Sequence, residues 1–187
     1  MPLKLHTVIC STRPGRIGPV IAQWFHGFAK GHGLFECELI DIADFDLPVY
    51  DEPVHPAKQQ YQREHTKAWS RSVAAADAYA FVIPEYNYCP PPSFFNALDY
   101  VYREWNYKPC GFVSYGGVSG GLRSAQLAKQ LVTAVKMMPM VESVMIQKVA
   151  EQLDGNGRFK PSEHHQHAAK GLLDELAKWA DALKSMR

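Results

Sequence analysis

The segment VICSTRPGRIG, residues 8–18, brings a thiol, two hydroxyl groups and two guanidinium groups into one short stretch. Cys10 and Arg16 are separated by five residues and follow an apolar run, which is the spacing of a cysteine-dependent phosphatase loop. The same residue types could instead hold a phosphate without covalent chemistry, because guanidinium groups pair with phosphate oxygens in bidentate fashion. The segment therefore supports two hypotheses: a thiolate nucleophile at Cys10, or a cradle for the phosphate of a coenzyme.

The elements on either side decide what this loop can do. The run LKLHTVIC before it is typical of a short β-strand, and the residues after it place Ile21, Ala22, Phe25 and Phe28 on one face of a helix that ends at GHG, residues 31–33. A helix N-terminus carries about half an elementary positive charge on its free N–H groups. An anion is therefore favoured in the loop whichever hypothesis holds.

Composition narrows the class of protein. The 187 residues are 47% hydrophobic, so we expect residues 1–187 to form a single domain. Twenty basic and 19 acidic residues give a formal charge of +1, which does not favour binding to nucleic acid or to an acidic membrane surface. The sequence has no run of about 18 apolar residues and no signal-peptide pattern, and its four cysteines are widely spread. We expect a cytoplasmic protein with reduced thiols and no metal site.

Apolar runs alternate with amphipathic stretches along the chain, which predicts a parallel sheet with crossover helices. Strands are predicted at 3–10, 35–42, 78–84, 109–115 and 140–149, and further helices at 57–76, 93–105, 122–138 and 164–184, with Ser93 as an N-cap. Right-handed crossovers that reverse direction once give a three-layer, doubly wound α/β fold of the flavodoxin type, with strand order 2-1-3-4-5. Ligands then bind at the carboxyl ends of strands one, three and four.

Three loops with unusual composition follow these strand ends: CSTRPGRIGP, PEYNYCPPP and SYGGVSGG. In the first loop, Ser11 and Thr12 offer hydroxyl donors, and Arg13 and Arg16 offer guanidinium groups to a phosphate. Any strand-to-helix turn needs some Gly, Pro or Ser, but three such loops at one edge of a sheet favour a binding site. The first loop is therefore predicted to hold a phosphate.

The other two loops suit a flat ring. Tyr86 or Tyr88 could cover the face of a heterocycle while backbone N–H groups bind its edge. Gly116 and Gly117 have no side chains to obstruct a planar ligand. A phosphate site beside a flat pocket describes a mononucleotide with a large conjugated base, and flavin mononucleotide (FMN) fits this description best.

Two features of a cysteine-dependent phosphatase are missing from the sequence. Ile17 follows Arg16, where such enzymes commonly have a hydroxyl residue, and no Asp-Pro pair is present to supply the acid. The histidines of EHHQH, residues 163–167, have no second ligand cluster and are predicted to lie at a solvated helix end. Neither feature indicates a catalytic side chain.

The segments STRPGRIGP, PEYN, NALDYVYREW and SYGGVSGG, in this order and spacing, resemble the NAD(P)H-dependent FMN reductase family over roughly residues 3–147. The resemblance implies a flavodoxin-like fold and bound FMN. It also implies hydride transfer from NADPH or NADH to the flavin, and ping-pong reduction of a flavin, quinone, azo or metal-oxyanion acceptor. Because the flavin carries this chemistry, no catalytic side chain is expected. Relatives pair through the aromatic-rich helix, which implies a homodimer or homotetramer.

The resemblance also assigns cofactor-binding positions. The FMN phosphate is expected at Ser11, Arg13, Arg16, Ile17 and Gly18, the edge of the ring at Pro84, Glu85, Tyr86 and Asn87, and the other side of the ring at Ser114, Tyr115, Gly116 and Gly117. The chain departs from the family at Cys10, where many relatives have glycine. It departs again at YCPPPSFF, where relatives often have a glycine-containing turn and a leucine-lysine pair. A flavodoxin-like electron carrier without nicotinamide activity is the alternative, although the acidic surplus typical of such carriers is missing.

Overall fold

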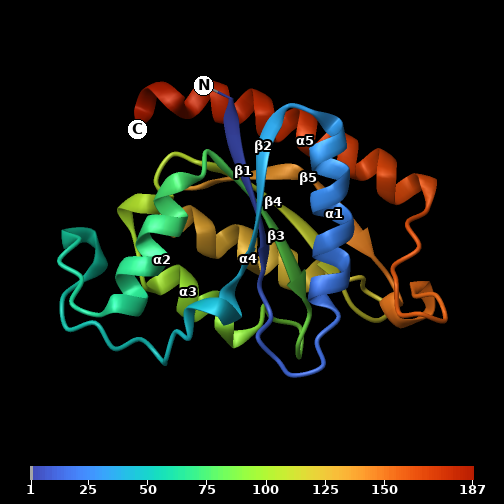
Figure 1. Ribbon diagram of the computed structural model, residues 1–187, viewed down its shortest axis with the longest axis horizontal. Helices are drawn as coiled ribbons and strands as arrows, with labels where there is room; N and C mark the ends of the chain where they lie inside the picture. Colours follow the sequence, from blue (N-terminus) through green and yellow to red (C-terminus); the bar gives the residue numbers. More distant parts are fainter. Residues whose placement is uncertain (1) are drawn as a thin grey trace.

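A parallel five-stranded sheet lies at the centre of the computed structural model, which describes residues 2–187 (Figure 1). The strands are β1 (Leu3–Ile9), β2 (Phe35–Asp41), β3 (Ala78–Pro84), β4 (Pro109–Tyr115) and β5 (Met138–Ile146). They pair in the order β2-β1-β3-β4-β5, which confirms the predicted topology. The winding reverses at β1 and β3, so the loops after these strands flank a crevice at the carboxyl edge.

Helices cover both faces of the sheet: α1 (Gly18–His32), α2 (Glu64–Ala75), α3 (Pro92–Asp99), α4 (Leu122–Ala134) and α5 (Glu163–Leu183). Helices α1 and α5 pack on one face, and α2, α3 and α4 on the other (Figure 1). On β3, Tyr79 and Phe81 belong to the core beneath α2–α4, while Ala80 and Val82 belong to the core beneath α1 and α5. A strand buried on both faces reads as an unbroken apolar run, which is why β3 was predictable.

Aromatic side chains fill the layer between the sheet and α2–α3. Trp69 and Trp105 are fully buried with ring centroids 5.9 Å apart, and Trp105 also meets Tyr79 at 5.0 Å. Burying a large apolar side chain contributes roughly 1.5–3 kcal/mol. This layer gives rigid support to the loop that follows β3.

The start predicted for the second helix, at residue 57, is wrong. Helix α2 begins only at Glu64, and the preceding chain forms a short 3-10 helix at Pro56–Lys58. The cause lies upstream, because the Glu52 carboxylate accepts hydrogen bonds from the backbone N–H groups of Gln62 (3.0 Å) and Arg63 (2.8 Å). A capping group from ten residues away cannot be read from local periodicity.

The helix predicted for residues 93–105 is shorter, and Ser93 is not its N-cap. Helix α3 starts at Pro92 after Pro91, and the Ser93 hydroxyl donates instead to the carbonyl of Cys10 at 2.6 Å. The helix ends at Asp99, and a 3-10 turn spans Arg103–Trp105. The Trp105 indole N–H donates to the carbonyl of Leu98 at 3.2 Å, which satisfies one of the free carbonyls at this helix end.

The remaining boundaries move by a few residues. Strand β5 runs from Met138 to Ile146 instead of 140–149, and α4 stops at Ala134 instead of 138. Helix α5 begins as predicted, but His165 is buried and not solvated, since its Nδ1 accepts the backbone N–H of Ser162 in a capping box.

Over residues 2–187 no helix is both long and apolar enough to cross a membrane, and no cluster of potential metal ligands occurs.

Candidate functional site

The loops after β1, β3 and β4 meet at the carboxyl edge of the sheet, as the topology predicts. The Ser11 hydroxyl and the Tyr86 phenol share a hydrogen bond of 2.8 Å, which joins the first loop to the second. The backbone N–H of Glu85 donates to the carbonyl of Tyr115 at 3.2 Å, which joins the second loop to the third. The three loops that carry the predicted site residues are therefore linked to one another by hydrogen bonds.

The two arginines of the first loop differ in their surroundings. Arg16 is largely buried, and its Nη2 donates to Asp41 at 2.5 Å. Asp41 is the last residue of β2 and pairs in register with Ile9 of β1, so the sheet itself brings this carboxylate to the loop. Arg13 is exposed, with its guanidinium carbon 5.8 Å from the centre of the Tyr86 ring. Arg13 is thus the cation that remains available to a ligand, and Arg16 anchors the loop.

The first loop has the properties of a phosphate site. Helix α1 begins at Gly18 with no side-chain cap on Ile17 and no acidic residue in its first turn, so the backbone N–H groups of Ile17 and Gly18 and the positive end of the helix dipole are available to the loop. Among residues 2–187, the buried atoms without a hydrogen-bond partner include Arg16 Nε and Tyr115 Oη. A methyl group added at Gly18 would lie 2.9 Å from Tyr115 Oη. The donor set and close packing therefore fit the phosphate of FMN.

Cys10 has the wrong environment for a nucleophile. The side chain is fully buried, and its thiol contacts the carbonyl of Val8 at 3.5 Å. Burial, and secondly the charge of Asp41, raises the pKa of this thiol well above its ordinary value. Because only the thiolate is reactive, this environment argues against the phosphatase alternative based on Cys10 and Arg16.

The second loop forms a tight hairpin turn beyond β3. The backbone N–H of Tyr86 donates to the carbonyl of Cys89, and the N–H of Cys89 donates to the carbonyl of Tyr86, both at 2.9 Å. The two residues between them, Asn87 and Tyr88, have φ angles of 51° and 70°. Positive φ suits asparagine but strains tyrosine, and such strain is concentrated at functional sites. Of these two residues, Asn87 lines a cavity at this edge of the sheet.

Arg123, which the sequence reasoning missed, holds this loop from α4. Its Nε donates to Glu85 Oε1 at 2.7 Å, and its guanidinium carbon lies 3.9 Å from the centre of the Tyr88 ring. Ser119 also donates to the Glu85 carboxylate at 2.9 Å. Burial pushes the pKa of Glu85 upward, but the hydrogen bonds from Arg123 and Ser119 outweigh it, so this pKa lies below its usual value. Glu85 is therefore an ionised structural anchor.

The third loop offers backbone to the site. The Ser114 hydroxyl donates to the carbonyl of Gly120 at 2.9 Å, and Tyr115 is buried beneath the first loop. Gly116 donates its N–H to Ile146 at 3.2 Å, whereas Gly117 is exposed with no atom within 4 Å of an added methyl group. The side chains of Ser114 and Tyr115 are thus engaged within the fold, and a ligand would meet mainly the glycine backbone.

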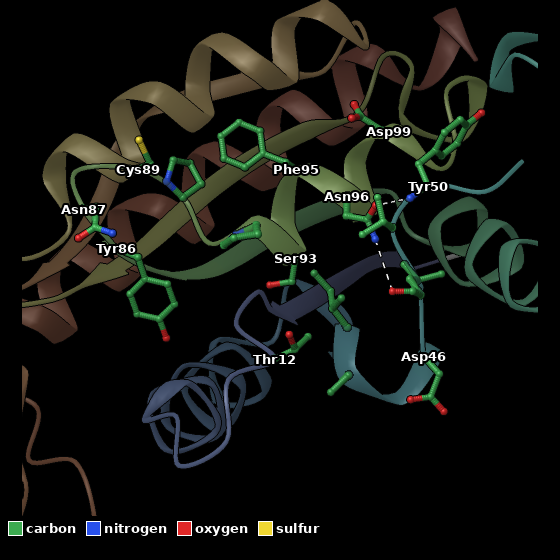
Figure 2. A pocket seen from close by; sticks show the side chains of 16 residues that line it. Thr12, Asp46, Tyr50, Tyr86, Asn87, Cys89, Ser93, Phe95, Asn96 and Asp99 are labelled. Atoms are coloured by element: carbon green, nitrogen blue, oxygen red, sulfur yellow. Dashed lines mark hydrogen bonds between the residues drawn. The ribbon is translucent and has the colours of Figure 1, made fainter.

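A cavity of about 1100 Å³ opens beside the first two loops (Figure 2). Thr12, Tyr86 and Asn87 form one side of it. The loop after β2 forms a further wall that was not predicted, with the residues Ile42, Ala43, Asp46, Leu47, Val49 and Tyr50. Cys89 and Pro90 continue the second loop, and Pro92, Ser93, Phe95, Asn96 and Asp99 come from α3. Because β2 neighbours β1, its carboxyl end lies at the same edge, and this adjacency is the signal that would have revealed the second wall.

The Asn96 side chain fixes that second wall. Its Oδ1 accepts the backbone N–H of Tyr50 at 3.0 Å (Figure 2), and its Nδ2 donates to the carbonyl of Pro48 at 2.5 Å. The Tyr100 hydroxyl donates to Pro48 at 3.1 Å and to Asp51 at 2.9 Å. A proline-rich loop is thereby held in one place against α3.

Together these features define a doubly wound α/β protein with a nucleotide-type crevice at the carboxyl edge of its sheet. The family model described as NADPH-dependent FMN reductase matches residues 3–151. A Nectria protein named NAD(P)H-dependent FMN reductase ntnL is 39% identical over 193 residues, covering 98% of this chain and 96% of that protein. A Schizosaccharomyces pombe protein named NAD(P)H-dependent FMN reductase C4B3.06c is 41% identical over 136 residues, or 72% and 68% of the two chains.

Solved structures agree on the fold. FerB, described as a flavoenzyme NAD(P)H:(acceptor) oxidoreductase from Paracoccus denitrificans, superposes with a TM-score of 0.75 at 21% identity, covering 96% of this chain and 98% of that one. The chain belongs to the NADPH-dependent FMN reductase family. It is accordingly an oxidoreductase whose cofactors are FMN and NAD(P)H.

Proposed function

We propose that this chain transfers electrons from NAD(P)H to a flavin, quinone, azo compound or metal oxyanion by ping-pong kinetics, with FMN held across the three loops. One observation carries the proposal: the hydrogen bond between Ser11 and Tyr86 joins a phosphate-type loop to the wall of a cavity large enough for a ring and a second substrate. When bound, FMN supplies the hydride chemistry, accepting two electrons from the nicotinamide and delivering them to the acceptor.

The first loop would bind the phosphate. Arg13 supplies an exposed guanidinium, and the start of α1 supplies N–H groups at Ile17 and Gly18. Arg16, paired with Asp41, keeps the loop in place. Its buried Nε has no hydrogen-bond partner within residues 2–187 and would be available to the phosphate. The loop thus fixes one end of the cofactor and so sets where the other end lies.

The second and third loops would orient the ring. Pro84 ends β3, where its carbonyl accepts the Ser124 hydroxyl at 2.7 Å, and Glu85 is fixed by Arg123. The Tyr86 N–H is used within the turn, so the backbone N–H of Asn87 would be the donor at a defined position, where it stabilises negative charge at the edge of a ring better than mobile water does. None of these groups needs to gain or lose a proton, which agrees with the expectation of no catalytic side chain.

Kinetics test the proposed order of events. Initial rates at several fixed acceptor concentrations should give parallel double-reciprocal lines against NADPH or NADH, because the nicotinamide leaves before the acceptor enters the same cavity. Intersecting lines would contradict the ping-pong scheme. Running the assay with a flavin, a quinone, an azo dye and chromate on the same preparation identifies which acceptor class is used.

Assembly and location remain predictions of the proposal. In the segment expected to pair subunits, Phe94, Tyr100 and Trp105 are buried, and the more exposed aromatic side chains are Phe95 and Tyr102. Light scattering on the purified protein should report a homodimer or homotetramer. A monomer at micromolar concentration would remove that part of the proposal. The cytoplasmic location rests on four free cysteines and is checked by cell fractionation.

A further inference from the structure

The wall of the cavity opposite Tyr86 and Asn87, called its far end below, carries two carboxylates (Figure 2). Asp46 follows the 3-10 helix Ile42–Phe45, which comes after β2, and Asp99 is the last residue of α3. None of the lining residues found in the described chain is lysine, arginine or histidine. The remaining lining groups at this end are apolar or aromatic, chiefly Val49, Tyr50 and Phe95.

Nearby cations are already paired or lie at the other end. Arg16 is bound to Asp41, and Arg63 lies 3.4 Å from Asp51. Arg13 lies over Tyr86, on the side of the first loop. Within residues 2–187, neither Asp46 nor Asp99 takes part in an ion pair. Among the described residues, the cavity lining therefore carries two carboxylates and no cation, and the exposed Arg13 lies outside it on the side of Tyr86.

The pKa of the Tyr50 phenol is raised, in agreement with negative charge at the far end of the cavity. Burial raises this pKa, and the charges of Glu52, Asp99 and Asp51 raise it further. Partial desolvation also raises the pKa of Asp99, although the residue remains exposed. An anion brought to this end of the cavity would meet the same repulsion that opposes ionisation of Tyr50.

We propose that the far end of this cavity selects the electron acceptor by charge, taking neutral or cationic aromatic molecules and disfavouring anionic ones, metal oxyanions and sulfonated dyes included. The inference rests on the proposed function, because it takes the cavity to be the acceptor site. Tyr50 and Phe95 supply aromatic surfaces for a flat ring, and the carboxylates of Asp46 and Asp99 repel anionic acceptors. Both carboxylates are exposed to solvent, so the effect is on the order of threefold to tenfold and decreases with salt.

Paired acceptors test the inference on the FMN-loaded protein. The value of kcat/KM is measured with neutral 1,4-naphthoquinone and with anionic 1,4-naphthoquinone-2-sulfonate, in the wild type and in the double variant Asp46→Asn/Asp99→Asn. The ratio of the anionic to the neutral value should rise about threefold to tenfold in the double variant, and the rise should shrink in 0.5 M salt. Comparing ratios between proteins cancels the difference in reactivity between the two quinones. Asn tolerates the left-handed backbone of Asp46, whose φ is 46°, so the substitution keeps the loop geometry.

Asp44→Asn is the matched control. Asp44 is an exposed carboxylate on the same 3-10 helix and does not line the cavity, so its removal should leave the ratio unchanged. A readout without turnover is the dissociation constant of naphthalene-2-sulfonate, measured by calorimetry, which should fall in the double variant and not in Asp44→Asn. An unchanged kinetic ratio and an unchanged dissociation constant in the double variant overturn the inference. Failure of the wild type to reduce either quinone would instead overturn the proposed function.

Discussion

The Ser11 hydroxyl and the Tyr86 phenol, 75 residues apart in the chain, lie 2.8 Å from each other. Ser11 follows β1 and Tyr86 follows β3, two strands that are neighbours in the sheet. The contact fixes the distance between the loop that suits a phosphate and the turn that suits the edge of a ring. The binding positions for the two ends of a cofactor that has both groups are therefore fixed before it binds, which reduces the entropy lost on binding.

Substitution of the two arginines in the first loop should affect different quantities, FMN affinity at Arg13 and protein stability at Arg16. Arg13→Ala removes the exposed guanidinium and is expected to weaken FMN binding about tenfold with little change in apoprotein stability, since a charge-assisted hydrogen bond contributes about 1.5–3 kcal/mol. Arg16→Ala leaves Asp41 largely buried and unpaired, and should lower the free energy of unfolding by about 1–3 kcal/mol.

Fluorescence titration of apoprotein with FMN and urea denaturation measure the two effects. Arg71→Ala, an exposed arginine on α2 away from the loops, is the control for a general change in charge. Equal loss of FMN affinity in Arg13→Ala and Arg71→Ala would contradict a phosphate contact at Arg13.

Replacing Cys10 distinguishes a structural thiol from a nucleophile. Cys10→Ser keeps a donor near the carbonyl of Val8 but buries a more polar group, so stability should fall by about 1–2 kcal/mol while FMN binding persists. Hydrolysis of p-nitrophenyl phosphate should be absent before and after the change. Hydrolysis present in the wild type and lost in Cys10→Ser would restore the phosphatase hypothesis.

Close packing at Gly18 predicts a pair of coupled substitutions. Gly18→Ala places a methyl group 2.9 Å from Tyr115 Oη and 3.3 Å from Ile9 Cγ2, and should destabilise the apoprotein by about 1–3 kcal/mol. Tyr115→Phe removes a buried hydroxyl that has no partner among residues 2–187 and should be near neutral alone.

The double variant should recover part of the stability lost in Gly18→Ala. Urea denaturation of all four proteins in the absence of FMN gives the coupling energy. Strictly additive effects would mean that the methyl group and the phenol do not meet.

Arg123 should make the second loop sensitive to acid. The pKa of Glu85 is lowered in the folded protein, so its contribution to stability is present above its unfolded value of about 4.5 and is lost as the pH falls through the folded value. Arg123→Ala removes most of that contribution, which solvent screening keeps small because the arginine is half exposed.

Denaturation curves of the wild type and Arg123→Ala should therefore differ at pH 7 and converge well below pH 4.5. Lys184→Ala, an exposed lysine beyond α5, controls for net charge. A gap between the curves that stays constant with pH would show that Glu85 is not the partner through which Arg123 acts.

Much of the fold was predictable because each strand carries its own signal. The run Ala78–Pro84 is apolar throughout since β3 is covered on both faces, and Gly33 ends α1 with a φ of 82°, which favours glycine. Errors arose where a distant group decides the local structure. Glu52 delays the start of α2, and the Ser93 hydroxyl bonds Cys10 instead of capping its own helix.

The same distinction holds for the site. The residue types in the first loop indicate a phosphate, but only the pairing of β1 with β2 shows that Asp41 engages Arg16 and leaves Arg13 available. The five-residue spacing of Cys10 and Arg16 is typical of a phosphatase loop, whereas the burial of the thiol, which the spacing does not reveal, argues against a nucleophile. Arg123 and the second cavity wall come from α4, α3 and the loop after β2, which no local motif connects to the three loops.

The most direct test of FMN- and NAD(P)H-dependent chemistry in this chain is one spectrum recorded during anaerobic titration. Purified protein, loaded with FMN where necessary, should be yellow, and its visible flavin band should bleach on stoichiometric addition of NADPH or NADH and return when 1,4-naphthoquinone is added. Colourless protein that cannot be loaded with FMN would contradict a flavin site at these loops. Bound flavin that neither nicotinamide bleaches would point instead to an electron carrier.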